Sequence, residues 1–193
     1  MNDRVYIQAV GDVNKSILMR LKKNLTWRFK PFNLKFSIIP EKLSLFPKDY
    51  DPMRNQYNAS KILNKLQIVA KEKMYFRLLG VLDVDIYSGI LNFIFGIANT
   101  PKLHTFKDTL PALISITRLR ETFYKREPND ALFELRILKE AVHELGHTFG
   151  LMHHEGECIM RFANSLMEVD IRPLDFCNSC VEKIKEFLSR LDF

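Results

Sequence analysis

The chain has 193 residues, of which 47% are hydrophobic and 27% charged, and its net charge at pH 7 is +6. This length fits one ordinary domain, and the balance of apolar and charged residues excludes a disordered, collagen-like or low-complexity chain. No apolar run approaches the ~18 residues of a membrane span, and the N-terminus has no signal-peptide pattern, so we expect a cytoplasmic protein that does not bind a membrane.

The first half of the chain alternates strand and helix patterns. All of the net positive charge lies in the first 36 residues. We interpret these basic side chains as the solvated face of a helix rather than as a surface for nucleic acid or membrane. The periodicity predicts, in order, a strand at 4–10, a helix capped by Asp12 and ending near residue 27, a strand at 34–39, a loop at 40–57 and a helix at 58–73.

The second half predicts more strands, then one long helix and a final shorter one. The strand patterns cover 75–84, 91–98 and 112–117, and the helical patterns cover 131–149, which Gly150 would end, and the region from Val181 to Leu191. This order of elements is typical of an α/β (α+β) fold with a mixed sheet. We expect a single domain over 1–193, with the sheet and the long helix in 1–150 and a smaller lower part in 151–193.

The long predicted helix carries two histidines, His143 and His147, and a third histidine follows at His153. Four residues of helix turn through about 400°, so the first two side chains project from one face, about 6 Å apart, and can bind one zinc ion. A continued helix would point His153 elsewhere, so the chain must turn back, and Gly150 can adopt the left-handed conformation that this turn needs. Three histidines leave the fourth zinc position open, as catalytic sites require.

Glu144 follows the first histidine directly, so it is better placed to meet a zinc-bound water than to bind the metal. Zinc lowers the pKa of its bound water to about 7, and the carboxylate can take the proton as a general base. Two alternatives stay open. The histidines could be ordinary packed or exposed residues of a helix, or the site could be real but empty or inactive.

Every cysteine of the chain belongs to a second cluster, made of His154, Cys158, Cys177 and Cys180. Three cysteines are an odd number, which favours reduced thiols over a disulfide framework. Four protein ligands leave no open position, so this spacing predicts a structural zinc that ties the segment after the long helix to the last helix. The alternative is a redox Cys-x-x-Cys pair with an unrelated third thiol, although no predicted strand precedes the pair.

The extended motif, His143-Glu-x-x-His-x-x-Gly-x-x-His153, resembles that of the metzincin zinc peptidases. The cysteines that follow resemble one branch of them, the archaemetzincins, in Cys158-Ile-Met160 and in the later Cys-x-x-Cys pair. His154 stands where that family usually has its first cysteine, so the second site would hold three thiolates and an imidazole.

The resemblance implies a metzincin-like fold, with a twisted mixed sheet, a long active-site helix and a small zinc-stabilised helical C-terminal subdomain. It implies two zinc ions per chain, one of them a catalytic zinc held by His143, His147 and His153. Glu144 would be the general base, and Met160 would lie in a tight turn beneath that zinc. Ordinary core packing is the alternative for Met160.

The implied function is that of a zinc metallopeptidase, in some family members with aminopeptidase character. We expect a peptide or protein substrate, no nucleic-acid partner and a monomer. The main rival is a zinc-stabilised binding protein with an inactive or unoccupied catalytic site. A second rival is a nucleic-acid binder that uses the Cys/His cluster and the basic first helix.

The resemblance also implies that the substrate adds a strand to an exposed sheet edge, formed here by residues 92–98. Gly96 and Ala98 are small enough to let a peptide backbone approach. The alternative is that this strand is paired on both sides. We interpret Asp83 and Asp85 as polar strand-end residues rather than a cation site, and His104 as a loop residue that binds no metal.

Overall fold

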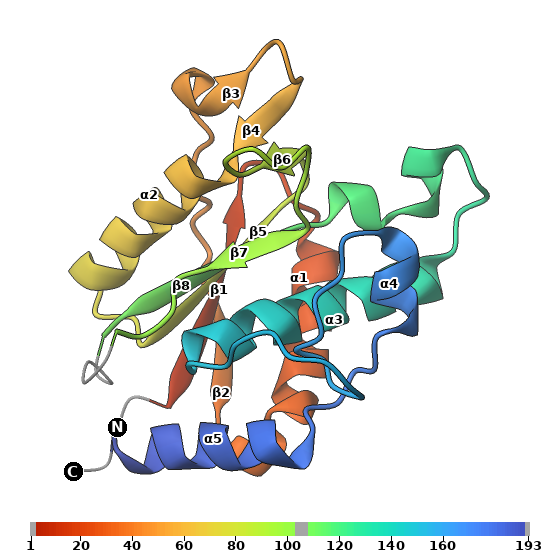
Figure 1. The fold of residues 1–193 in the computed structure, drawn as a ribbon. Coiled ribbons are helices and arrows are strands. Elements are labelled where there is room, and N and C mark those ends of the chain that lie inside the picture. Colours follow the sequence, from red (N-terminus) through yellow and green to blue (C-terminus); the bar gives the residue numbers. More distant parts are fainter. Residues whose placement is uncertain (1–2, 103–107, 192–193) are drawn as a thin grey trace.

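A five-stranded sheet lies at the centre of the computed structural model, which describes residues 3–102 and 108–191 (Figure 1). Its strand order is β2-β1-β5-β8-β7, and only β7 runs antiparallel to its neighbour. The bounds are Arg4–Val10 for β1, Lys35–Ile38 for β2, Arg77–Leu82 for β5, Gly96–Ala98 for β7 and Leu110–Ser115 for β8. The predicted α/β fold with a mixed sheet is therefore confirmed.

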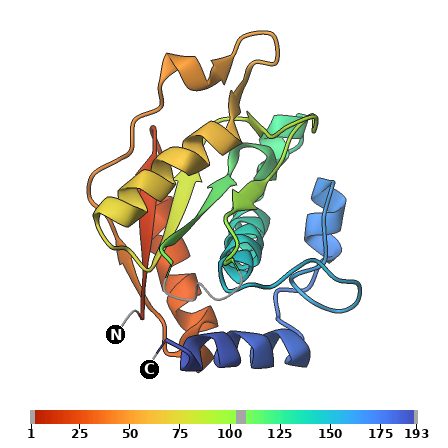
Figure 2. The same cartoon turned by 60° about the vertical axis from the view of Figure 1, so that its left-hand side comes forward.

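Helices cover both faces of this sheet. Helices α1 (Lys15–Arg28) and α3 (Asp130–Thr148) lie on one face, and α2 (Ala59–Glu72) lies on the other (Figures 1 and 2). Strands β5 and β8 are consequently buried at every position. Alternate residues serve the two layers: Leu79 packs with α1 and α3, whereas Leu78 packs with α2.

Smaller elements surround the sheet. A second, three-stranded sheet is made of β3 (Tyr50–Asp51), β4 (Gln56–Asn58) and β6 (Ile86–Tyr87), and helices α4 (Leu166–Ile171) and α5 (Asn178–Ser189) follow α3. Short 3-10 helices cover Lys30–Phe32, Pro47–Asp49, Thr117–Leu119 and Glu121–Tyr124. Within the described ranges, no helix has both the length and the apolar character that a membrane span demands.

Two details of the predicted first half are wrong. Asn14, not Asp12, caps α1, because its side chain accepts a hydrogen bond from the Ser16 backbone at 2.9 Å. Asp12 instead pairs with Lys42 at 2.6 Å. The predicted loop at 40–57 also contains the short antiparallel strands β3 and β4.

The strand predicted at 91–98 is regular only over Gly96–Ala98. The stretch before it makes other contacts: Arg54 donates to the Leu91 carbonyl at 3.1 Å, Gln56 donates to the Asn92 carbonyl at 2.8 Å, and the Ile94 backbone donates to the Ile86 carbonyl at 3.1 Å. In the described part of the chain, β7 pairs with β8 alone and ends the sheet, as the edge-strand hypothesis requires.

Candidate metal centres

Helix α3 carries the first candidate centre and stops where the histidine spacing requires. Asn129 caps its start by accepting a hydrogen bond from the Leu132 backbone at 3.0 Å. After Thr148 the chain reverses at Gly150, whose φ is +84°, and the Leu151 backbone donates to the Gly146 carbonyl at 3.2 Å. This turn leads the chain back towards the helix.

The turn brings three imidazoles together at a single point. The Nε2 atoms of His143, His147 and His153 lie 3.1 Å from one another in every pair. Nδ1 of His143 lies 2.8 Å from the Ile159 carbonyl, and Nδ1 of His147 lies 2.8 Å from the Leu151 carbonyl. A carbonyl can only accept, so both protons sit on Nδ1 and leave the Nε2 lone pairs facing one another.

This donor set fits a zinc ion. Tetrahedral zinc, with bonds of about 2.0–2.1 Å to imidazole, holds such nitrogens roughly 3.3 Å apart. Burial lowers the pKa of His143 well below its usual range and that of His147 to about 4, and it lowers the pKa of His153 as well. The imidazoles are therefore neutral near pH 7, which is the form that binds a metal.

Glu144 lies beside this centre and lines the same cavity. Its side chain is buried, and no hydrogen bond within residues 3–102 and 108–191 involves its carboxylate. Burial raises the pKa of Glu144 well above its usual range, and the neighbouring Glu140 raises it further, while Arg172 opposes them. A bound cation would favour the ionised form.

Gly96 of the edge strand makes room for this carboxylate. A Cβ atom on Gly96 would lie 2.6 Å from both Cγ and Oε1 of Glu144. Any larger residue at position 96 must therefore displace Glu144. The sequence predicts a small residue here for the approach of a peptide, and the structure adds a second reason, because a side chain at this position would collide with Glu144.

The cavity over the three histidines has a volume of about 280 Å³. Edge strand β7 forms one wall and residues 162–164 form part of another. Its apolar lining includes Leu91, Phe93, Phe95, Met152 and Phe162. An extended peptide with apolar side chains fits the chemistry of this lining.

Met160 lies in the segment that follows α3 and is fully buried. Its sulfur lies 2.5 Å from the place that a Cβ on Gly146 would occupy, so it packs directly on the helix backbone between the first two histidines. This contact agrees with both readings of Met160, core packing and support beneath the centre.

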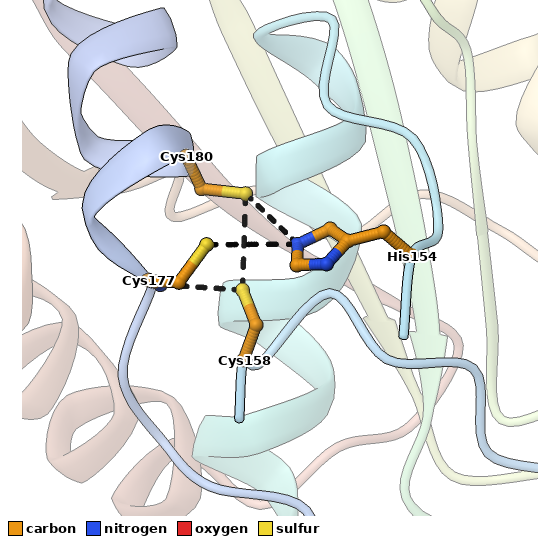
Figure 3. A group of neighbouring side chains, drawn as sticks. All are labelled: His154, Cys158, Cys177 and Cys180. Atoms are coloured by element: carbon orange, nitrogen blue, oxygen red, sulfur yellow. Dashed lines mark hydrogen bonds between the residues drawn. The ribbon is translucent and has the colours of Figure 1, made fainter. Parts of the chain in front are cut away.

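The second cluster, His154, Cys158, Cys177 and Cys180, also comes together (Figure 3). Its four ligand atoms all lie within 4.8 Å of one another. The Cys158 and Cys180 sulfurs are 3.8 Å apart, and His154 Nε2 is 3.2 Å from the Cys180 sulfur. Zinc with Zn–S bonds of about 2.3 Å places sulfur ligands roughly 3.8 Å apart, so this group also fits the metal.

The three sulfur atoms influence one another and are contacted by backbone amides. Burial raises the pKa of Cys180, and the nearby Cys158 thiolate raises it further. A cation among the sulfurs would reverse that effect. The Cys158 sulfur also accepts hydrogen bonds from the backbones of Met160, at 3.4 Å, and Cys177, at 3.3 Å, so it lies within the cluster. Cys158 is thus no unrelated third thiol.

The two aspartates are engaged by cations of the protein itself. Arg118 binds Asp85 and Arg120 binds Asp83, each through two hydrogen bonds of 2.6–2.7 Å. This agrees with the expectation that they form no cation site. His104 lies outside the described residues.

A buried ion pair that the sequence does not predict lies beside the first centre. The Arg172 guanidinium binds the Glu140 carboxylate, and both side chains are buried. Another Arg172 nitrogen lies 3.1 Å from Nδ1 of His143. Only the charge of these residues and the position of Glu140, one helical turn before Glu144, could have suggested this pair.

Known proteins resemble this chain over most of its length. Residues 15–186 match the model of peptidase family M54. The archaemetzincin of Pyrococcus furiosus is 38% identical over 98% of this chain and 96% of its own, and that of Methanocaldococcus jannaschii is 39% identical over 95% and 93%. The crystal structure of the Archaeoglobus fulgidus archaemetzincin, complexed with malonate, is 33% identical, covers 93% of this chain and 99% of its own, and gives a TM-score of 0.73.

Proposed function

The chain belongs to peptidase family M54, the archaemetzincins, and is a zinc metallopeptidase; from this premise we propose which residues perform the hydrolysis. His143, His147 and His153 hold the catalytic zinc, and Glu144 is the general base. His154, Cys158, Cys177 and Cys180 hold a second, structural zinc. The observation that carries the proposal is the set of three Nε2 atoms, 3.1 Å apart, in a cavity that Glu144 lines.

Zinc at the three histidines would supply Lewis-acid polarisation of the scissile carbonyl and a lower pKa for water. The chain's residues supply the positioning and the proton transfer. The carbonyls of Ile159 and Leu151 fix the orientation of two imidazoles. Glu144, which has no hydrogen-bond partner among the described residues, takes a proton from the attacking water and delivers it to the leaving amine.

The substrate is a peptide that extends the sheet beyond β7. The free side of this strand borders the cavity at Gly96 and Ala98, where a peptide backbone can pair with it. The apolar wall, which includes Phe93 and Phe162, favours apolar side chains next to the scissile bond.

We propose cleavage within a peptide rather than removal of its first residue. A carboxylate is the usual partner for the substrate ammonium of an aminopeptidase, and among the described residues the cavity lining offers only Glu140 besides the base. Arg172 neutralises Glu140. Matched peptides with free and acetylated N-termini test this: equal cleavage is expected, and cleavage of free N-termini alone would establish aminopeptidase action instead.

The free state of the three cysteines supports a reducing compartment, such as the cytoplasm, as the place of action. Metal analysis of the purified protein, followed by digestion of a peptide library with and without chelator, tests the whole proposal. Zinc at both centres and chelator-sensitive cleavage are expected. Full zinc occupancy without cleavage would favour the rival binding protein.

A further inference from the structure

The two candidate centres share one short stretch of chain, residues 153–160, called here the shared segment. His153 and His154 are adjacent in sequence, yet their imidazoles belong to different clusters. The shared segment contains no helix or strand. Regular backbone hydrogen bonding therefore does not hold His153 in place, and other contacts must do so.

The shared segment serves the first centre at two further points. The Ile159 carbonyl lies 2.8 Å from Nδ1 of His143 and so sets the orientation of that ring. The Met160 side chain packs on Gly146, between the two helical histidines. The segment thus supplies one ligand, one orienting carbonyl and one packing contact.

Two ligands of the second centre also belong to the shared segment. His154 lies directly after the first-centre ligand His153, and Cys158 lies directly before Ile159. The Cys158 sulfur accepts a hydrogen bond from the Met160 backbone at 3.4 Å. A metal ion bound by His154 and Cys158 therefore constrains each part of the segment that the first centre uses.

Helix α5 provides the other two ligands of the second centre and is anchored in the core. Cys177 and Cys180 lie at its start, and Ile184 and Phe187 bury its apolar face in the main core. The Cys177 backbone donates to the Cys158 sulfur at 3.3 Å. A metal ion in the second centre thereby fastens the shared segment to a helix that belongs to the core.

We propose that metal binding at the second centre sets the metal affinity of the first, with His154 and Cys158 as positioning residues. This inference rests on the proposed function, because it takes both clusters to be metal centres. Loss of supporting contacts around metal ligands typically costs 10- to 100-fold in affinity, and we expect an effect of about that size. Linkage requires the effect to be reciprocal, so metal in the first centre tightens the second by the same factor.

Titration of the metal-free full chain with Co²⁺ tests this without measuring activity. Binding to thiolates gives a near-ultraviolet charge-transfer band that the three-histidine centre lacks, so the two affinities can be measured separately. Cys180→Ser disables the second centre from α5, outside the shared segment. Ser179→Ala changes an exposed residue of α5 between the two cysteines and keeps every ligand, and His154→Cys keeps four ligands at the second centre.

Wild type, Ser179→Ala and His154→Cys should bind Co²⁺ at the first centre with similar affinity, and Cys180→Ser should bind it about 10- to 100-fold more weakly. Equal affinity in Cys180→Ser, or an equal loss in Ser179→Ala, would overturn the inference. If Cys180→Ser does not fold, the effect of the first centre on the metal affinity of the second centre tests the inference instead. His153→Ala, at an exposed position, should weaken the thiolate centre by the same factor relative to the doubly loaded wild type, and an unchanged affinity would overturn the inference. A wild type that binds Co²⁺ only at the thiolates would instead refute the proposed catalytic centre.

Discussion

In the proposed mechanism, the proton transfers depend on the Glu144 carboxylate. Glu144→Gln keeps the shape of the side chain but cannot take a proton, so peptide hydrolysis should fall by roughly 10²- to 10⁴-fold. Zinc content should stay unchanged. Turnover equal to that of the parent would refute the assignment as base, and loss of zinc would show that Glu144 is a ligand.

Gly96 and Ala98 lie on the same strand but should have different roles: Gly96 leaves room for the Glu144 carboxylate, and Ala98 leaves room for the substrate peptide. A Cβ on Gly96 would lie 2.6 Å from the Glu144 carboxylate oxygen Oε1, so Gly96→Ala should displace the base and lower kcat by roughly 10²-fold. Ala98→Val adds bulk beside the proposed peptide strand and should mainly raise KM. Steady-state kinetics of both variants, with zinc content as control, tests this. Equal effects on kcat and KM in both variants would contradict it.

At the scale of single residues, the sequence predicts contacts between residues that are close along the chain, but not contacts between distant residues. The positions of His143, His147 and Gly150 follow from helix geometry, and the structure shows the turn they require. The fit between Gly96 and Glu144 joins two residues whose proximity only the folded sheet creates. The same holds for the pair of Arg172 and Glu140, which no sequence periodicity signals.

Among the elements, α5 is the one whose position should depend most on the second metal. Cys177→Ser removes a ligand at its start, and the C-terminal part should then unfold locally. Zinc contributes about 10–16 kcal/mol of apparent binding free energy in small zinc domains, and a loss of even a quarter of this would lower Tm by roughly 10 °C. Thermal melting and zinc analysis measure the effect.

Ser179→Ala provides the matched control for Cys177→Ser. Ser179 is an exposed residue of the same helix, between the two cysteines, so its substitution should leave Tm and zinc content unchanged. A Cys177→Ser protein that behaves like this control would show that the second cluster does not stabilise the fold.

Long elements were predictable and short ones were not. Helices α2 and α3 have caps and several turns of apolar periodicity, and their observed bounds differ from the predicted ones by a residue. Strands β3, β4 and β6 have only two or three residues each, and α4 has six, so none carries a usable period. The stretch before β7 has a strand-like sequence but is held by side chains of distant residues, including Arg54.

At the scale of the whole molecule, α3 packs against the central sheet and carries two ligands of the first centre, whereas the ligands of the second centre come from the segment after α3 and from the start of α5. Alternating strands and helices predict a mixed sheet covered on both faces, because buried strands need apolar layers above and below them. That arrangement is observed. The sequence places ligands of both centres within residues 153–160, but it could not reveal the contact of the Ile159 carbonyl with His143, since this contact depends on how the folded segment returns to α3.

The central claim is that the three-histidine centre holds the catalytic zinc. The most direct test is to remove the zinc of this more open centre with a mild chelator and then to return zinc stepwise. The three-histidine centre has a free coordination position, whereas the second cluster is closed by four protein ligands, so the first should lose its metal first. With one zinc ion per chain, peptide hydrolysis should be absent, and it should rise in proportion to added zinc until two ions per chain are bound. Full hydrolysis at one zinc ion per chain, or none at two, would contradict the account.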